Sequence, residues 1–408
     1  MMKRVTLSIC AVSICALLSL SSTGAAQEQD AIQKSVLKKH RISGPVVECL
    51  AALSEECILS ASLTTVIDEA QAIERIKVLS ALALGLAEAG DLERAVRPLD
   101  SALEELGAIR FSFVQKMKQA EIAPIYAYIG KSEEVLSLTA DLGSIIKGQT
   151  LEECIYMAAL AGRDRDVLTY VNALTLYAQR RPYILTDAAE MLAVTGDPSI
   201  VIDALLLDKN FRSRPSLMVR TAYVKGVDRD VKAGLLRDAA DEMKNHYGMY
   251  QRVRFAAANR AAGDAQDADI LENFAEIEKE LRSMADKRDM ALDMGRTYTS
   301  LGMSERAISQ AFYFKTADEQ ANYLMRISRL PDGKNILSAG TAYADAVDAV
   351  LSEAAKLESP LERDTVRLKL LESARRVSSL DIAKKVVISL EDDDNSAKGL
   401  ALLLPLLK

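Results

Sequence analysis

The chain has 408 residues with 51 Lys and Arg against 58 Asp and Glu, and this net charge of −7 argues against nucleic-acid binding, which needs basic surfaces. Hydrophobic residues make up 49% of the chain but aromatic residues only 5%, with no Trp. This composition, rich in Ala and Leu, favours closely packed helices and disfavours a β-sheet.

Residues 1–26 have the pattern of a signal peptide. Lys3 and Arg4 form a short basic region, an apolar run extends from Val5 to Leu20, and small residues precede Gln27. The apolar run is shorter than the ~20 residues of a membrane-spanning helix, which argues against the alternative of an uncleaved anchor. We therefore expect cleavage and export to a bacterial periplasm. The remaining chain has 49 basic and 58 acidic residues, a net charge of −9.

Residues 27–44 form a polar lead-in to the first predicted helix. Cys49 and Cys57 can meet if the chain turns near residues 52–55, and an exported protein can form a disulfide between them. The alternative is that both are small, buried apolar side chains. Cys154 lies on an apolar helical face and is expected in the core.

Turn residues recur along the chain at spacings of 30 to 45 residues. These markers are Gly90, Gly130, Gly162, Gly196, Gly226, Gly263, Gly302, the turn at 331–333 and Ser378. Each is flanked by residues with helical apolar periodicity. Glycine suits the left-handed residue that ends a helix, and Asp91 can cap the helix that follows Gly90. Because helix-turn-helix repeats have such periods, residues 45–390 are predicted to form an all-α solenoid of about nine helical hairpins.

The best copies of this unit resemble tetratricopeptide (TPR) repeats, in which a small residue, a large residue, a Gly-Asp turn and a second small residue follow one another. Around the first marker these positions hold Ala83, Leu86, Gly90-Asp91 and Ala95. Around the seventh marker they hold Gly295, Tyr298, Gly302 and Ala307. Other copies depart from the pattern, with valine at the second small position: Val135, Val167, Val201 and Val231. The resemblance implies a TPR-like superhelix whose concave groove is lined mainly by the first helix of each hairpin.

The middle of the chain is more basic than its flanks. Residues 161–260 hold 16 basic and 12 acidic residues, a net charge of +4, and most of the basic residues are arginine. Arginine suits bidentate contact with carboxylate or phosphate groups. The TPR resemblance places five residues in or near this region on the groove: Arg220, Tyr223, Tyr250, Arg260 and Arg296. The alternative is an ordinary solvated helix surface with salt bridges.

Residues 391–408 are expected to form an acidic linker, or alternatively an acidic helix end, followed by a short apolar tail from Gly399 to Leu407. The tail is expected to be a last helix that covers the open end of the solenoid; alternatively, it docks on a membrane-associated partner. Asp392, Asp393 and Asp394 lack the alternating ligands and turn glycine of a calcium loop, so no metal site is predicted there.

No sequence motif points to catalysis. His40 and His246 are the only histidines and stand apart from any cysteine, and the chain contains no Gly-rich phosphate loop and no nucleophile elbow. We therefore expect no enzyme activity, no cofactor and no metal. The predicted function is a periplasmic scaffold that binds a protein or peptide with acidic groups. Alternatives are a cell-envelope glycan or peptidoglycan binder, and an assembly factor that self-associates through its ends.

Overall fold

The structure, a computed structural model, describes residues 44–69, 71–174, 179–222, 224–243, 288–300, 302–330, 333, 336 and 340–407. The predicted signal peptide, His40, His246 and all but the last residue of the lead-in lie outside the described residues. Over the described ranges the chain is all-α, as predicted, and contains no β-strand.

The first part of the chain contains α2 (Gly44–Ala51), α3 (Glu55–Asp68), α4 (Ala72–Glu88), α5 (Leu92–Leu106), α6 (Ser112–Ile129), α7 (Ser132–Ala140), α8 (Ser144–Leu160), α9 (Asp164–Ala173), α10 (Arg181–Thr195), α11 (Ser199–Leu206), α12 (Pro215–Ala222) and α13 (Arg229–Met243). The last part contains α16 (Arg288–Ser300), α17 (Ser304–Ser309), the 3₁₀ helix η1 (Gln310–Tyr313), α18 (Ala317–Ser328), α19 (Ala342–Ala354), α20 (Pro360–Arg376), α21 (Leu380–Ser389), α22 (Asp393–Ala401) and the 3₁₀ helix η3 (Leu404–Leu407).

Left-handed residues stand at most of the predicted turn markers. The glycines with φ between 71° and 98° are Gly90, Gly130, Gly162, Gly226 and Gly302, and Ser378 has a φ of 60°. Asp91 caps α5, because its Oδ1 accepts a hydrogen bond from the backbone N–H of Arg94 at 3.1 Å. Gly196 differs, since its φ of −162° is an extended conformation. Gly263 lies outside the described residues.

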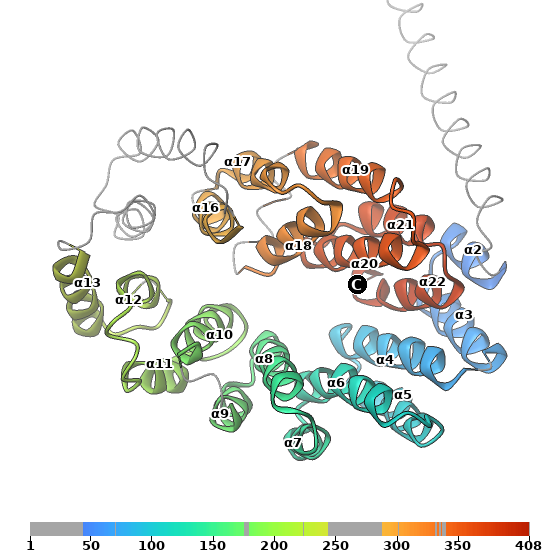
Figure 1. The fold of residues 1–408 in the computed structure, drawn as a ribbon, viewed down its shortest axis with the longest axis horizontal. Coiled ribbons are helices and arrows are strands. Elements are labelled where there is room, and N and C mark those ends of the chain that lie inside the picture. The colour runs from blue at the N-terminus through green and yellow to red at the C-terminus, as the bar shows by residue number, and fades with distance from the viewer. Residues whose placement is uncertain are drawn as a thin grey trace, which may run out of the picture.

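The helices form an inner and an outer row (Figure 1). In the inner row α6 packs between α4 and α8, and α10 packs between α8 and α12. In the outer row α9 contacts both α7 and α11. Beyond residue 287 the inner row contains α16, α18 and α20, with α18 in contact with both of the others. This arrangement is compatible with a helical-repeat protein.

The turns of neighbouring hairpins stack on one another. A Cβ atom added to Gly162 would lie 2.5 Å from the carbonyl oxygen of Thr195, so only glycine permits this approach. In the same way Arg163 packs over Gly130 and donates a hydrogen bond from Nε to the carbonyl oxygen of Tyr128 at 2.8 Å. The C-terminal ends of α6, α8 and α10 therefore share one edge of the array. Their N-terminal ends share the opposite edge.

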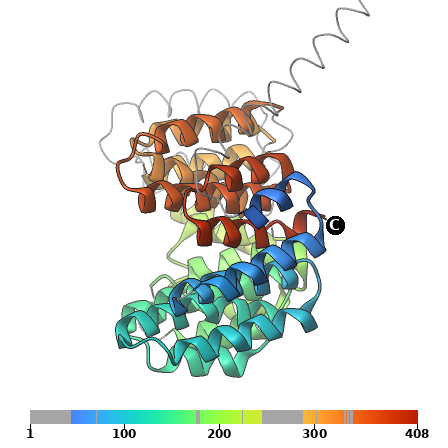
Figure 2. The same ribbon diagram turned by 90° about the vertical axis from the view of Figure 1, so that its right-hand side faces the viewer.

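The first and last helices of the described part of the chain pack against each other (Figures 1 and 2). Both α22 and η3 contact α3 and α4. Gly85 on α4 allows this packing, because a Cβ atom there would collide with the carbonyl oxygen of Ala401. Leu400 and Leu403 are buried in the same contact region. The apolar tail thus covers the first helices of its own chain, where a cover for the open end of an array was expected.

The acidic residues begin α22, which agrees with the predicted alternative of an acidic helix end and not with a solvated linker. Asp392 is the N-cap, with Oδ1 accepting a hydrogen bond from the backbone N–H of Asn395 at 2.9 Å. Asp393 and Asp394 lie in the first turn, where negative charge stabilises a helix. A run of aspartates that caps a helix has the same composition as a solvated linker, so composition alone leaves both alternatives open.

Cys49 and Cys57 form a disulfide in the structure, with Cα atoms 5.4 Å apart. The chain turns between α2 and α3, in the segment where the sequence places the turn. Cys154 is buried on α8 and is the free cysteine of the described residues. A bond so close to the N-terminus fixes α2 against α3, on which α22 packs.

We predict that Cys57→Ser lowers the free energy of unfolding by about 2–3 kcal/mol, because the bond closes a short loop in the unfolded chain. Urea denaturation measures the change. Reduction of the wild type should reproduce the loss, and reduction of the variant should add nothing to it. Non-reducing peptide mapping that recovers both cysteines as free thiols would contradict this expectation.

We predict that Gly85→Ala destabilises the fold by about 1–3 kcal/mol, because the added methyl group forces α22 away from α4. Gly107→Ala is the matched control. Gly107 has a φ of −62°, and an added Cβ atom would lie 3.4 Å from the nearest oxygen. The control should change the stability by less than about 0.5 kcal/mol. Equal effects of the two substitutions in urea denaturation would refute close packing at Gly85.

Candidate functional site

Two predicted groove residues, Arg220 on α12 and Arg296 on α16, meet at one carboxylate of α10. Arg220 Nη2 lies 2.6 Å from Asp187 Oδ1, and Arg296 Nη2 lies 3.3 Å from the same oxygen. Arg220 Nε also donates to Glu190 Oε1 at 2.8 Å. The structure thus brings these two arginines together. The other predicted groove residues lie outside the described residues: Tyr223, Tyr250 and Arg260.

These contacts engage both arginines within the chain. Burial raises the pKa of Asp187, but the charges of Arg296 and Arg220 outweigh it and hold that pKa below its ordinary value. Asp187 and Glu190 together balance the charge of the two guanidinium groups. The geometry therefore favours the salt-bridged alternative over a groove of free arginines.

A second group of charges joins α20 to α4, and with α8 and Arg329 it forms what we term the central cluster: Glu88, Glu153, Tyr156, Arg329, Glu372, Arg375 and Arg376. Arg376 Nη2 lies 3.0 Å from Glu88 Oε1, and Arg375 contacts the other oxygen of Glu88. Glu372 accepts from Arg376 Nε at 2.8 Å and from Arg375 Nη1 at 2.9 Å. The side chains of Arg375 and Glu88 are only 3% and 8% exposed.

Arg329, which follows α18, extends the central cluster to α8. Its guanidinium lies 4.6 Å from the centre of the Tyr156 ring, and its Nη2 is 3.3 Å from Glu153 Oε1. Arg376 lies 5.8 Å from the same ring centre. Three arginines and three glutamates balance in charge, so the central cluster holds elements together and leaves no excess charge for a ligand. Its members are scattered along the sequence, and no spacing pattern predicts them.

Exposed apolar side chains gather instead at the N-terminal ends of α6 and α8. Phe111 and Phe113 are 76% and 67% exposed, and Ile145 is 66% exposed. Met117, one helical turn after Phe113, is also exposed. Because α6 and α8 are parallel neighbours, these side chains lie at one edge of the array. With the nearby cations Arg110, Lys116 and Lys147 they form what we term the α6–α8 edge.

This edge continues the inner face of the array. Met117 and Tyr128 are eleven residues apart on α6, and Ile145 and Tyr156 are eleven residues apart on α8, which places each pair on one face of its helix. Tyr156 faces Arg376 inside the fold, and Tyr128 is close enough to feel the charge of the same arginine. The exposed residues therefore lie at the mouth of the inner face. The helical periodicity of the sequence predicts that each of these pairs shares a face. Only the packing of the helices shows that the N-terminal part of this face is exposed.

The cations of the α6–α8 edge differ from Arg220 and Arg296 in their ion pairing. Arg110 is exposed, and Lys116 and Lys147 are half-buried. None of the three forms an ion pair with another residue in the described part of the chain. Phenylalanine, methionine and arginine are enriched in protein–protein interfaces relative to the rest of a protein surface.

No protein-family model and no curated protein matches the chain. Among solved structures, the crystal structure of Ton1535 from Thermococcus onnurineus NA1 is similar over 79% of this chain and 98% of that chain, at 15% sequence identity and a TM-score of 0.29. A TM-score this low does not establish a common fold. Of the helices in the described ranges, none combines the length and the apolar character that a bilayer crossing requires.

We predict that Glu88→Gln destabilises the fold by about 3–5 kcal/mol, because it leaves the two buried guanidinium groups of Arg375 and Arg376 with the single carboxylate of Glu372. Glu353→Gln is the control, since Glu353 pairs with Lys356 on an exposed surface. The control should cost less than about 1 kcal/mol. A loss of similar size in both variants, measured by urea denaturation, would show that the central cluster has no special role.

Proposed function

We propose that this protein is a binding scaffold for another protein or peptide, and that the α6–α8 edge is its docking surface. The observation that carries the proposal is the set of exposed apolar side chains beside cations that form no ion pair with any other described residue. Contiguous exposed apolar surface is uncommon on a protein without a partner. The occupant we propose is a peptide segment with apolar anchors flanked by acidic residues, which complements Arg110, Lys116 and Lys147 in charge.

This proposal keeps the acidic partner expected from the sequence but moves the site that binds it. Arg220 and Arg296 are engaged by Asp187, so a ligand carboxylate would have to displace an existing ion pair. The cations of the α6–α8 edge need no such displacement. A partner segment that binds here would lie along the edge, next to the inner face that the TPR resemblance assigns to binding and across which the central cluster joins α4, α8 and α20.

We also propose a repeat family and a cellular location for this scaffold. We propose a TPR-like repeat protein that is exported to the periplasm. The signal-like residues 1–26 and the disulfide between Cys49 and Cys57 support export. Self-association through the apolar tail has less support, because Leu403 and Leu404 are buried within the chain.

A photo-crosslinking residue in place of Phe113 should capture a discrete partner in cells. The same residue in place of Leu361, which is 71% exposed on α20, is the control and should capture none. A peptide that contains the crosslinked segment should then bind the purified protein in calorimetry. Lys116→Glu with Lys147→Glu should weaken that binding by at least about tenfold. Equal capture at both positions, or no effect of the charge reversal, would refute the docking surface.

A further inference from the structure

Three carboxylates from opposite ends of the chain meet where α22 packs on α4. Glu74 lies in the first turn of α4, Asp392 is the N-cap of α22, and Asp394 lies in the first turn of α22. One oxygen of each lies within 4.8 Å of the others. The spacing of the aspartates alone predicts no metal site, because the third carboxylate belongs to the other end of the chain.

Asp394 is buried and has no hydrogen-bond or ion-pair partner among the described residues. The residue is only 8% exposed, and its carboxylate accepts no hydrogen bond and forms no ion pair with any residue in the described ranges. Negative charges of Glu69, Asp392 and Glu74 act on it, and Lys77 opposes them. A buried carboxylate that faces two other carboxylates requires a compensating positive charge.

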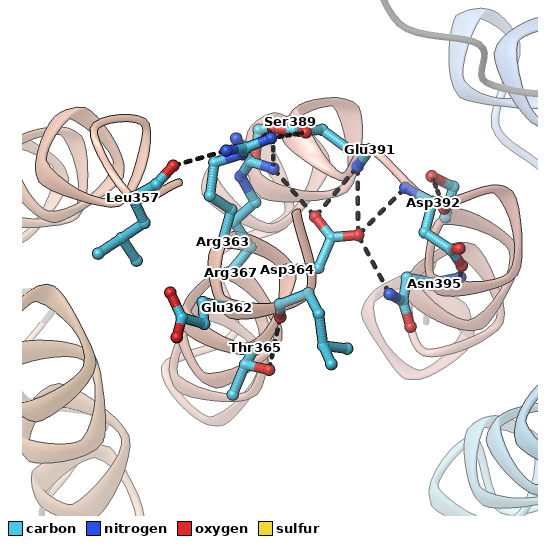
Figure 3. A network of polar contacts seen from close by, with 12 residues as sticks. Leu357, Glu362, Arg363, Asp364, Thr365, Arg367, Ser389, Glu391, Asp392 and Asn395 are labelled. Atoms are coloured by element: carbon cyan, nitrogen blue, oxygen red, sulfur yellow. Dashed lines mark hydrogen bonds and ion pairs between the residues drawn. The ribbon is translucent and has the colours of Figure 1, made fainter. Parts of the chain in front are cut away.

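The loop that carries the two aspartates is fixed from its other side (Figure 3). Asp364 on α20 is 1% exposed and accepts hydrogen bonds from the backbone N–H groups of Glu391 and Asp392, both at 3.1 Å. It also accepts from Asn395 Nδ2 at 3.1 Å. These three bonds involve neither oxygen of Asp394. They hold the start of α22 in a set position relative to α4.

The charge balance of this acidic cluster fits a divalent cation. Lys77 pairs with Glu74 Oε2 and neutralises one of the three negative charges. Two negative charges remain. All three ligands are carboxylates, which are the groups that hard cations prefer, and Ca²⁺ tolerates irregular oxygen geometry better than Mg²⁺ does.

We propose that Glu74, Asp392 and Asp394 bind one hard divalent cation, with Ca²⁺ preferred, and that this ion fastens α22 to α4. Water molecules complete the coordination shell, as is usual when a protein supplies few ligands. The ion stabilises the contact between the two ends of the chain. This inference does not depend on the α6–α8 edge.

Isothermal titration of the chelator-treated protein with CaCl₂ should show one bound ion per chain, and MgCl₂ should bind more weakly. Asp394→Asn and Glu74→Gln should each weaken Ca²⁺ binding by at least about tenfold. Asp393→Asn is the matched control, because it removes the same charge from the next residue of the same turn. It should weaken binding by less than about threefold, since a carboxylate outside the site acts only through screened charge.

The thermal unfolding temperature gives a second readout. A variant that merely folds poorly would not show the expected pattern. Without divalent ions, Asp394→Asn should unfold at a higher temperature than the wild type, because it removes an uncompensated buried charge. With CaCl₂ in excess the wild type should gain stability and the variant should not. The proposal is overturned if the wild type shows neither heat nor a thermal shift with CaCl₂, or if Asp393→Asn and Asp394→Asn lose affinity equally.

Discussion

The packing of α22 onto α3 and α4 is the contact on which the rest of the structure depends. In a simple repeat array each unit contacts only its sequence neighbours, and the stability is a sum over those contacts. Here the last helix buries apolar side chains against helices from the start of the chain. Folding must therefore bring the two ends together. The ion pairs between Glu88 and α20, and the approach of Glu74 to α22, both follow from this closure.

Closure also determines which charges are free to act on other molecules. Arginines from distant helices share carboxylates both at the half-exposed Asp187 and in the buried central cluster. The charges in each of these networks already balance one another. Removing one side chain therefore leaves a charge of the opposite sign uncompensated. The cations of the α6–α8 edge stand outside these networks and beside exposed phenylalanines. Because of this contrast we propose the α6–α8 edge as the docking surface.

Local signals in the sequence predict much of this fold, whereas long-range contacts leave no such signal. Glycines in the left-handed conformation and the Asp91 cap depend on a few adjacent residues, so the sequence predicts them correctly. The pairing of Arg220 and Arg296 with Asp187 depends on how α10, α12 and α16 pack, and periodicity does not contain that information. The turn that brings Cys49 and Cys57 together is local and was predictable. The grouping of Glu74 with two aspartates of α22 was not.

Closure of the chain is tested most directly by hydrogen exchange on a protein that ends at residue 392 and so lacks α22 and η3. If the ends pack as described, backbone amides of α3 and α4 should lose protection together with those of α20 and α21, although they lie at the other end of the sequence. An increase in exchange confined to α20 and α21 would contradict closure. It would indicate an open array of helices instead.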